Sequence, residues 1–247
     1  PFSTLTADPG LEAVPRALAS GLTIHYESPV ARLERGARGA ALVLADGASV
    51  EADRIVLAVP GPRAATLLDD PSPVEAELMA TPYSSGLLVV VALSRRLADH
   101  ELGGAYGLLA SPGRSGPLAA LCASSRAGHA APGRDAVTVM LDGEVAGECI
   151  KRGTPDEELV GCAVESLCAL APSLEAAVDR ASSRVVRIPA AMPTCRAGRA
   201  CLVRRYRGEQ SGPVVLAGDY LAFPWSDSAA LTGLWAANRV RLAAERG

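Results

Sequence analysis

Apolar and polar residues follow one another along the chain in patterns that change twice, which divides it into three blocks. The first block opens with Leu11, Val14 and Leu18 at helical spacing, and Gly21 follows as a stop signal. Segments with alternating or continuous apolar residues come next and predict strands at residues 22–26, 30–34, 40–44, 49–51 and 54–59. After Pro60, residues 63–68 are predicted to form a helix.

Two features of this block indicate how its strands pair. Asp46-Gly47 stands between two of the predicted strands and is typical of a tight hairpin. Residues 54–59 are almost continuously apolar up to Pro60, which indicates a strand buried on both faces, as in a parallel sheet. The block therefore predicts both antiparallel and parallel pairing.

The middle block has a different pattern of apolar and polar residues. Four strand-like segments are separated by loops rich in glycine and proline, which favours antiparallel pairing: residues 86–93, 105–109, 117–123 and 137–142. A helix follows, with Thr154 predicted as its N-cap and Pro172 as its end. Its predicted buried face consists of Val160, Val164, Leu167 and Ala171. Residues 183–188 are predicted as a further strand.

The last block carries the strongest functional pattern. Residues 213–219 form a buried strand that ends in Gly218-Asp219, and a loop leads to a helix that begins after Asp227 or Ser228 and runs to about residue 245. Ligands of open α/β sheets bind at the carboxyl ends of strands. Gly218 permits close backbone approach, and Asp219 can accept hydrogen bonds from hydroxyl groups.

The start of that helix adds a second binding feature. Free N–H groups and the positive end of the helix dipole are expected near Ser228, Ala229 and Ala230, whose small side chains would admit a flat ligand. An ordinary strand–loop–helix crossover with Asp227 as N-cap accounts for the same pattern. The residues alone leave both interpretations open.

Composition narrows the class of protein. The 247 residues suffice for one large or two small domains, and no apolar run approaches the roughly 20 residues that span a bilayer. A net charge of −3 does not favour a nucleic-acid partner. The six cysteines lack CxxC spacing and no signal peptide is seen, which favours structural thiols and a cytoplasmic location. His25, His100 and His129 form no metal-binding pattern, and no hydrolase nucleophile motif occurs.

Residues 217–233 resemble the terminal flavin motif of FAD-dependent oxidoreductases of the protoporphyrinogen oxidase and amine oxidase superfamily. That motif has a Gly-Asp or Gly-Glu pair, a short loop, Glu-Gly-Ala and Ser-Gly. Here Asp227-Ser228-Ala229 and Thr232-Gly233 stand at the last two places. The resemblance implies that Asp219 meets the ribityl or pyrophosphate region of FAD. It also implies that the backbone of residues 229 and 230 meets the isoalloxazine ring.

The resemblance extends over most of the chain. Residues 10–19 are similar to a family helix, and Val30 stands where the family has a valine whose backbone binds the adenine. Residues 46–60, ending in Pro60, resemble the strand that leads back to the cofactor. Residues 187–198 resemble a segment of the protoporphyrinogen oxidase branch, which usually has Tyr and His where Cys195 and Arg199 stand. Trp225 would then wall the substrate cavity, with a core aromatic as the alternative.

The resemblance implies an α/β fold with α+β character. Residues 1–70 and 189–247 would form the carboxyl-terminal part of a Rossmann-like FAD domain, and residues 71–188 an inserted substrate domain with a mixed or antiparallel sheet. The GxGxxG motif that grips the pyrophosphate does not occur in the sequence. We therefore expect an amino-terminal segment or a separate subunit to supply it, which would make the protein a heteromer in the second case.

Three functions remain open from the sequence. The first is transfer of a hydride from an organic substrate to flavin by a protoporphyrinogen oxidase-like enzyme. The second is an amine or amino-acid oxidase, for which a lysine near the flavin and an aromatic cage are expected, whereas the single lysine is Lys151. The third is a non-catalytic partner subunit. Arg204, Arg205 and Arg207 would either steer a carboxylated substrate or form a solvated segment. The sequence identifies no catalytic residue.

Overall fold

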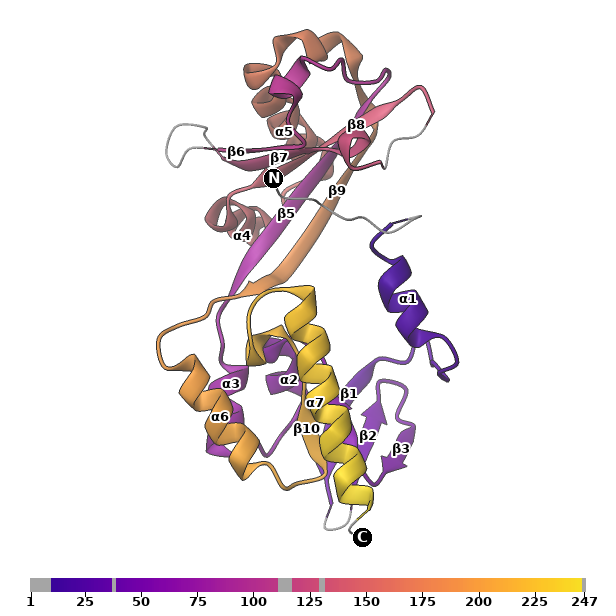
Figure 1. Ribbon diagram of the computed structural model, residues 1–247, viewed down its shortest axis with the longest axis vertical. Helices are drawn as coiled ribbons and strands as arrows, with labels where there is room; N and C mark the ends of the chain where they lie inside the picture. The colour runs from indigo at the N-terminus through magenta and orange to yellow at the C-terminus, as the bar shows by residue number, and fades with distance from the viewer. Residues whose placement is uncertain (1–9, 37–38, 111–116, 129–131, 246–247) are drawn as a thin grey trace. The chain divides into compact units, whose positions relative to one another are not determined.

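The computed structural model describes residues 10–36, 39–110, 117–128 and 132–245 (Figure 1). The chain divides into two compact units, and each unit is formed by two separate segments of the sequence. Unit 1 comprises Pro1–Thr23 and Ser85–Pro189, and unit 2 comprises Ile24–Ser84 and Ala190–Gly247. Within the described residues, no helix combines the length and the apolar composition needed to cross a membrane.

Unit 1 is built on a five-stranded sheet. Its strands, in the spatial order β6-β7-β8-β5-β9, are β5 (Tyr83–Leu93), β6 (Gly107–Leu109), β7 (Leu118–Ala123), β8 (Asp135–Leu141) and β9 (Val178–Pro193). The pairs β5–β8, β6–β7 and β7–β8 are antiparallel, which confirms the predicted antiparallel middle block. Strand β9 is much longer than the predicted residues 183–188.

Among its described residues, unit 1 also contains three α-helices and three 3₁₀ turns. They are α1 (Ala13–Ala19), α4 (Gly143–Arg152) and α5 (Asp156–Leu170), with 3₁₀ turns η1 (Glu101–Gly104), η2 (Ser124–Ala127) and η3 (Pro172–Ala177). The predicted inner face of α5 is buried as expected. The prediction that Thr154 caps α5 is wrong, because Pro155 occupies the N-cap and Thr154 donates its N–H to Cys149 at the end of α4 instead. Residues 111–116, which were predicted as one of the loops rich in glycine and proline, and His129 lie outside the described residues.

The core of unit 1 follows from strict alternation along β5. Leu87, Val89, Val91 and Leu93 are at most 1% exposed, and they pack with residues of β7, β8 and α5. Alternate residues of a strand point to opposite faces, so one face of the sheet carries the whole cluster. Unit 1 thus has one continuous hydrophobic core.

Unit 2 begins with an antiparallel sheet of three strands: β1 (Val30–Arg35), β2 (Ala40–Leu44) and β3 (Ser49–Ala52). The predicted hairpin at Asp46-Gly47 is confirmed, with Gly47 at φ +88° and β2 paired with β3. The predicted strand at residues 22–26 is wrong, because these residues are exposed and pair with no strand among those described. Alternation alone does not form a strand without a partner edge.

The remainder of unit 2 surrounds a parallel pair of strands, β4 (Ile55–Leu57) and β10 (Val214–Leu216). Its helical elements are α2 (Gly61–Leu67), α3 (Pro73–Met79), α6 (Arg199–Glu209), η4 (Asp219–Leu221) and α7 (Ser226–Ala244). The parallel pairing was predicted. The prediction that β4 is buried on both faces is wrong, because Val56 is 40% exposed.

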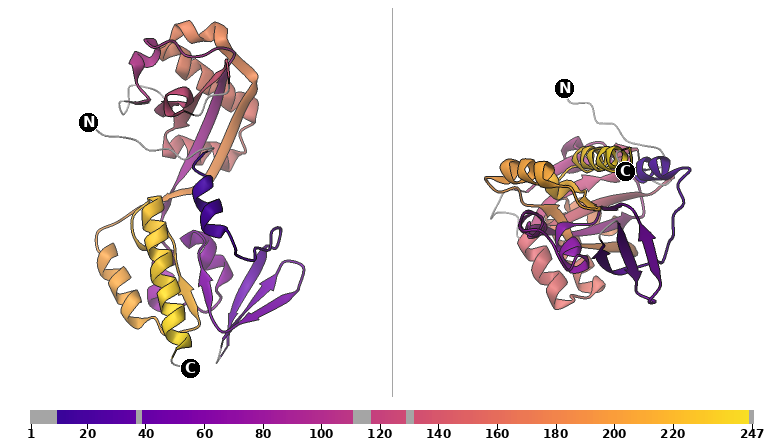
Figure 2. Two further views of the ribbon diagram at one scale, coloured as in Figure 1. Left: turned by 45° about the vertical axis from the view of Figure 1, so that its right-hand side comes forward. Right: turned by 90° about the horizontal axis from the view of Figure 1, so that it is seen from below.

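Helices α6 and α7 lie side by side in unit 2 (Figures 1 and 2). The rings of Tyr206 on α6 and Trp235 on α7 are 5.7 Å apart. Tyr206 is 1% exposed and its hydroxyl oxygen accepts a hydrogen bond from the N–H of Leu216 at 2.7 Å. This contact ties α6 to β10, the strand that leads to Gly218.

Candidate functional site

Gly218 makes a sharp turn at the carboxyl end of β10. Its backbone angles, φ +145° and ψ 167°, belong to a region that only glycine adopts readily. A Cβ atom at this position would lie 2.8 Å from Cε1 of Tyr220, so a side chain would force the turn to shift. The sequence pattern Gly-Asp therefore reflects a backbone requirement as well as access for a ligand.

Thr232 on α7 holds this turn in place. Its hydroxyl accepts a hydrogen bond from the N–H of Gly218 at 3.0 Å, and its own proton points to the carbonyl of Ala229 at 2.9 Å or that of Gly218 at 3.2 Å. Thr232 is fully buried. The turn and the first two turns of α7 thus form one fixed unit of backbone.

Asp219 is positioned by a tyrosine from a distant part of the sequence. The hydroxyl of Tyr83 donates to Oδ1 of Asp219 at 2.9 Å and lies 3.5 Å from the N–H of Gly61. Burial, reinforced by the hydrogen bond to Asp219, raises the pKa of Tyr83, so the phenol stays protonated and keeps its donor. Among the described residues, the other carboxylate oxygen of Asp219 has no hydrogen-bond partner and can accept one from a ligand.

Helix α7 starts slightly earlier than predicted. It begins at Ser226, with Trp225 at the N-cap and no side chain capping the helix. The N–H of Ser228 is already bonded to Asp227 at 2.8 Å and that of Ala229 to Trp225 at 3.1 Å. The backbone N–H groups without a partner among the described residues are therefore those of Ser226 and Asp227, two positions before those expected.

The side chains of the first turn still leave room for a ligand. Ser228 is 6% exposed, whereas Ala229 and Ala230 are exposed and present only methyl groups. Trp225 is 70% exposed, which excludes the alternative that it is a core aromatic of the described structure.

Pro60 and Val30 complete the set of predicted site residues. Because β4 and β10 are parallel, Pro60 follows β4 at the same end of the pair where Gly218 follows β10. Pro60 is the N-cap of α2, and Arg63 in that helix donates to the carbonyl of Val30 at 2.9 Å. All eight predicted residues thus belong to unit 2. Seven of them lie in the segments that follow β4 and β10 or at the start of α7, and the eighth, Val30, begins β1.

Sequence reasoning missed the residues that support this arrangement. Tyr83 gave no signal, because its partner Asp219 lies 136 positions away. Arg199 was noted only as a departure from the family pattern, whereas its guanidinium donates to the carbonyl of Tyr220 and to the hydroxyl of Thr81. The Thr232-Gly233 pair was a visible signal whose role the structure explains.

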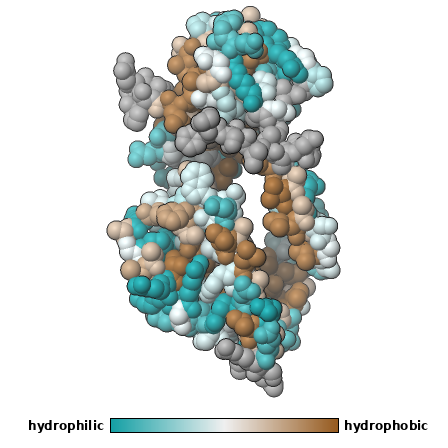
Figure 3. Space-filling model, viewed as in Figure 1, coloured by the Kyte–Doolittle hydropathy of each residue, from teal (hydrophilic) through white to brown (hydrophobic). Residues whose placement is uncertain are grey.

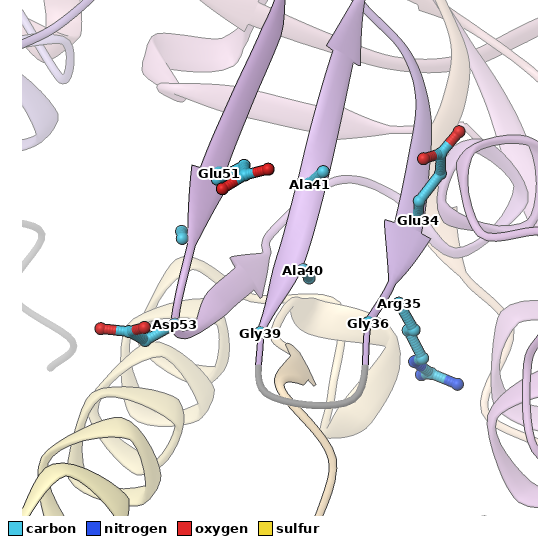
Figure 4. A pocket seen from close by; sticks show the side chains of 9 residues that line it. Glu34, Arg35, Gly36, Gly39, Ala40, Ala41, Glu51 and Asp53 are labelled. Carbon is cyan, nitrogen blue, oxygen red and sulfur yellow. The ribbon is translucent and has the colours of Figure 1, made fainter.

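One cavity of unit 2 lies away from these residues. It measures about 490 Å³ and opens between the ends of the strands β1–β3, where Figure 4 shows the side chains of Glu34, Glu51 and Asp53. None of the eight predicted residues lines it. No group of three His, Cys, Asp or Glu side chains within the described ranges has an arrangement that could hold a metal ion.

The comparison with known families decides the affiliation of the chain. The model of the family described as flavin containing amine oxidoreductase matches residues 3–241. The chain belongs to this family. It is thus a member of a family of flavin-dependent oxidoreductases, and FAD is the cofactor that the membership implies, as predicted from the terminal motif. No curated protein matches the sequence.

Solved structures agree on the fold. The chain is similar to a candidate protoporphyrinogen oxidase from Exiguobacterium sp. 255-15, with a TM-score of 0.73 and 18% identity over 94% of this chain and 52% of that one. It is also similar to putrescine oxidase bound to putrescine, with a TM-score of 0.68 and 17% identity over 94% and 53%. Reduced UDP-galactopyranose mutase gives 0.66 and 16% over 86% and 46%.

Because the sequence identities are low, these structural matches establish the fold alone. The chain spans about half the length of the solved structures it matches. The predicted α/β and α+β fold of an FAD-dependent oxidoreductase is confirmed.

Proposed function

We propose that this chain supplies the carboxyl-terminal part of the flavin site of an FAD-dependent oxidoreductase, which takes a hydride from an organic substrate. The observation that carries the proposal is the Gly218-Asp219 turn, fixed by Thr232 and Tyr83 beside the open start of α7. In this proposal, residues 1–70 and 189–247 contribute to the FAD-binding part and residues 71–188 form the substrate domain.

The residues present fit FAD. The free oxygen of Asp219 would accept a hydrogen bond from a ribityl hydroxyl, or from a group near the pyrophosphate. The unpartnered N–H groups of Ser226 and Asp227 and the helix dipole favour negative charge at the start of α7. The methyl side chains of residues 229 and 230 admit a flat ring. When bound, FAD supplies the hydride acceptor, and the chain supplies orientation and hydrogen bonds.

A partner carrying the GxGxxG turn is the second part of the proposal. The β4–β10 pair has only three residues in each strand, and parallel pairs are stable when further strands and helices cover them. Leu231 and Leu234 on α7 are 62% and 63% exposed. An amino-terminal segment or a separate subunit that extends the parallel sheet would cover apolar surface here and bring the phosphate-binding turn.

The position of the single lysine favours the protoporphyrinogen oxidase-like branch over an amine oxidase. Lys151 is exposed on α4 of unit 1 and forms an ion pair with Glu148 at 3.0 Å, so it is engaged on a helix surface. The six cysteines are free thiols, which supports the cytoplasm as the proposed location.

The decisive measurement is FAD binding by the chain combined with a GxGxxG-bearing amino-terminal counterpart. We expect a yellow complex with the visible absorbance of oxidised flavin, and for Asp219→Ala an affinity roughly 10- to 100-fold lower, because a charged hydrogen-bond acceptor is lost. Asp53→Ala, an exposed acid of the same unit, is the matched control. Equal FAD affinity for the two variants would contradict the assignment of Asp219.

Turnover then separates the remaining functions. The yellow complex is offered porphyrinogens and amines in parallel, and flavin bleaching under exclusion of oxygen is recorded. Bleaching by porphyrinogens alone supports the proposed branch, and bleaching by amines alone supports the alternative. A complex that binds FAD but is bleached by neither class would favour a non-catalytic partner subunit.

A further inference from the structure

A second cavity in unit 2 lies against the inner side of α6. It measures about 780 Å³, and its apolar wall consists of Val203 on α6, Leu221 at the end of η4 and Phe223 just after it. Ligand pockets for small molecules typically measure about 300–1,000 Å³ and are lined mainly by apolar groups. The size and the wall thus suit a small organic molecule rather than a single ion.

The remaining lining is strongly cationic. Arg196, Arg199, Arg204 and Arg207 border the cavity, and no acidic residue does. None of the four has a carboxylate partner within 4.0 Å in the part of the chain that the structure describes. Arg199 binds only neutral oxygens, and Arg207 lies 5.2 Å above the ring of Trp235. The positive charge of this wall is therefore uncompensated.

The geometry of α6 separates the arginines that the sequence presented as one cluster. Arg204 and Arg207 are three positions apart, on the helix face that also carries Val203 and borders the cavity. Arg205 is absent from the lining and forms an exposed ion pair with Glu209 at 3.3 Å. The two arginines that face the cavity have a role that Arg205 does not share.

We propose that this cavity binds a small organic anion, a carboxylate or phosphate carried on an apolar ring or chain. The apolar body would pack on Val203, Leu221 and Phe223, and the anionic group would pair with Arg204 and its neighbours, since guanidinium groups bind carboxylate and phosphate in forked geometry. A cationic amine is disfavoured by the same charges. The inference does not depend on FAD, because none of the eight residues assigned to the flavin lines this cavity.

The test is a fluorescence titration of the purified chain with 1-pyrenebutyrate, with 1-pyrenebutanol as the neutral analogue. We expect the carboxylate to bind at least about 10-fold more tightly than the alcohol at low salt, with the difference shrinking as salt screens the charges. Arg204→Gln is expected to weaken carboxylate binding about 10-fold and to leave binding of the alcohol unchanged. Arg205→Gln, on the opposite face of α6, is the matched control and should bind like the unmodified chain.

A second variant tests the place of binding independently of charge. Ala200 lines the cavity and is exposed, so Ala200→Phe fills space without disturbing the core. It should weaken both probes to a similar degree while the circular dichroism spectrum stays unchanged. The proposal is overturned if carboxylate and alcohol bind equally, if Arg205→Gln costs as much as Arg204→Gln, or if only an acidic peptide binds and pyrenebutyrate does not.

Discussion

The two units build their cores on different kinds of sheet. Unit 1 closes its core within itself, since a five-stranded sheet and α5 cover Leu87, Val89 and Leu167 almost completely. Unit 2 has a parallel pair of three-residue strands and leaves Val56, Leu231 and Leu234 between 40% and 63% exposed. Unit 1 has the anatomy of a self-supporting domain. Unit 2 has that of part of a larger sheet, and it holds the candidate site.

The difference can be measured, because both tryptophans, Trp225 and Trp235, belong to unit 2. Tryptophan fluorescence therefore reports unfolding of unit 2, while far-ultraviolet circular dichroism reports both units. We expect unit 2 to unfold at lower denaturant concentration than unit 1.

The largest effects are expected from core truncations in each unit. Leu167→Ala in unit 1 and Leu78→Ala in unit 2 remove side chains that are 0% exposed, and each should lower the free energy of unfolding by about 2–5 kcal/mol. Leu78→Ala should move the fluorescence transition, whereas Leu167→Ala should move only the transition seen by circular dichroism. If both variants shift both signals equally, the units unfold as one and the comparison fails.

A smaller effect is expected at the turn beside the site. Gly218→Ala should destabilise unit 2 by about 1–3 kcal/mol, because alanine avoids this backbone region and its Cβ would meet the ring of Tyr220 at 2.8 Å. Gly208→Ala is the control, since a Cβ there meets nothing within 4 Å in α6 and should stabilise the helix by about 0.5–1 kcal/mol. Unchanged unfolding of Gly218→Ala in urea would disprove strain at the turn.

Acid should weaken unit 1 through Glu101. Arg95 donates two hydrogen bonds to this carboxylate at 2.7 and 2.8 Å, and despite partial burial these contacts lower its pKa from 4.5 to about 2. Since the folded pKa lies below the unfolded one, this stabilisation is present above about pH 5 and is lost as the pH falls toward 2.

Glu101→Gln checks the acid effect. At neutral pH it should lower the free energy of unfolding by about 1–2 kcal/mol, and it should flatten the decline of stability between pH 5 and 2 seen by circular dichroism. An unaltered pH profile would mean that other acids govern acid unfolding. The fluorescence signal of unit 2 is the internal control.

The smallest effect is expected for Arg205→Ala. Its ion pair with Glu209 is four residues along the helix, and both side chains are about half exposed. Such pairs stabilise by less than about 0.5 kcal/mol, so the fluorescence midpoint should barely move. A decrease of more than about 1 kcal/mol in the free energy of unfolding would contradict this. It would show that the exposed ion pair contributes substantially to the stability of α6.

Local signals in the sequence predicted much of the fold. The Asp46-Gly47 hairpin and the strands of unit 1 follow from turn residues and alternation, which act over short distances. Helix α3 was overlooked although Ser72 and Glu75 form a capping box at its start. Helix α6 gave no apolar period, because only Val203 and Tyr206 of its 11 residues are buried and four of the others are arginines.

The site was harder to predict from the sequence than the fold, for a physical reason. The Gly218-Asp219 turn was visible, because backbone geometry restricts the residue types there. Its supports, Tyr83 and Thr232, act through hydrogen bonds that close only after distant segments have packed. The segment at residues 22–26 shows the converse, since its alternation has no partner edge and forms no strand.

The course of β5 and β9 bears on how such proteins diversify. The N–H of Thr194 donates to the carbonyl of Pro82 at 2.8 Å, and the N–H of Ser94 donates to that of Ala177 at 2.8 Å, so the two strands run antiparallel. The chain thus leaves unit 2 and returns to it at neighbouring points. A segment whose two ends lie side by side can be exchanged without rerouting the backbone on either side of it. Evolution or an engineer could therefore replace residues 85–189 as a cassette while keeping the Gly218-Asp219 turn.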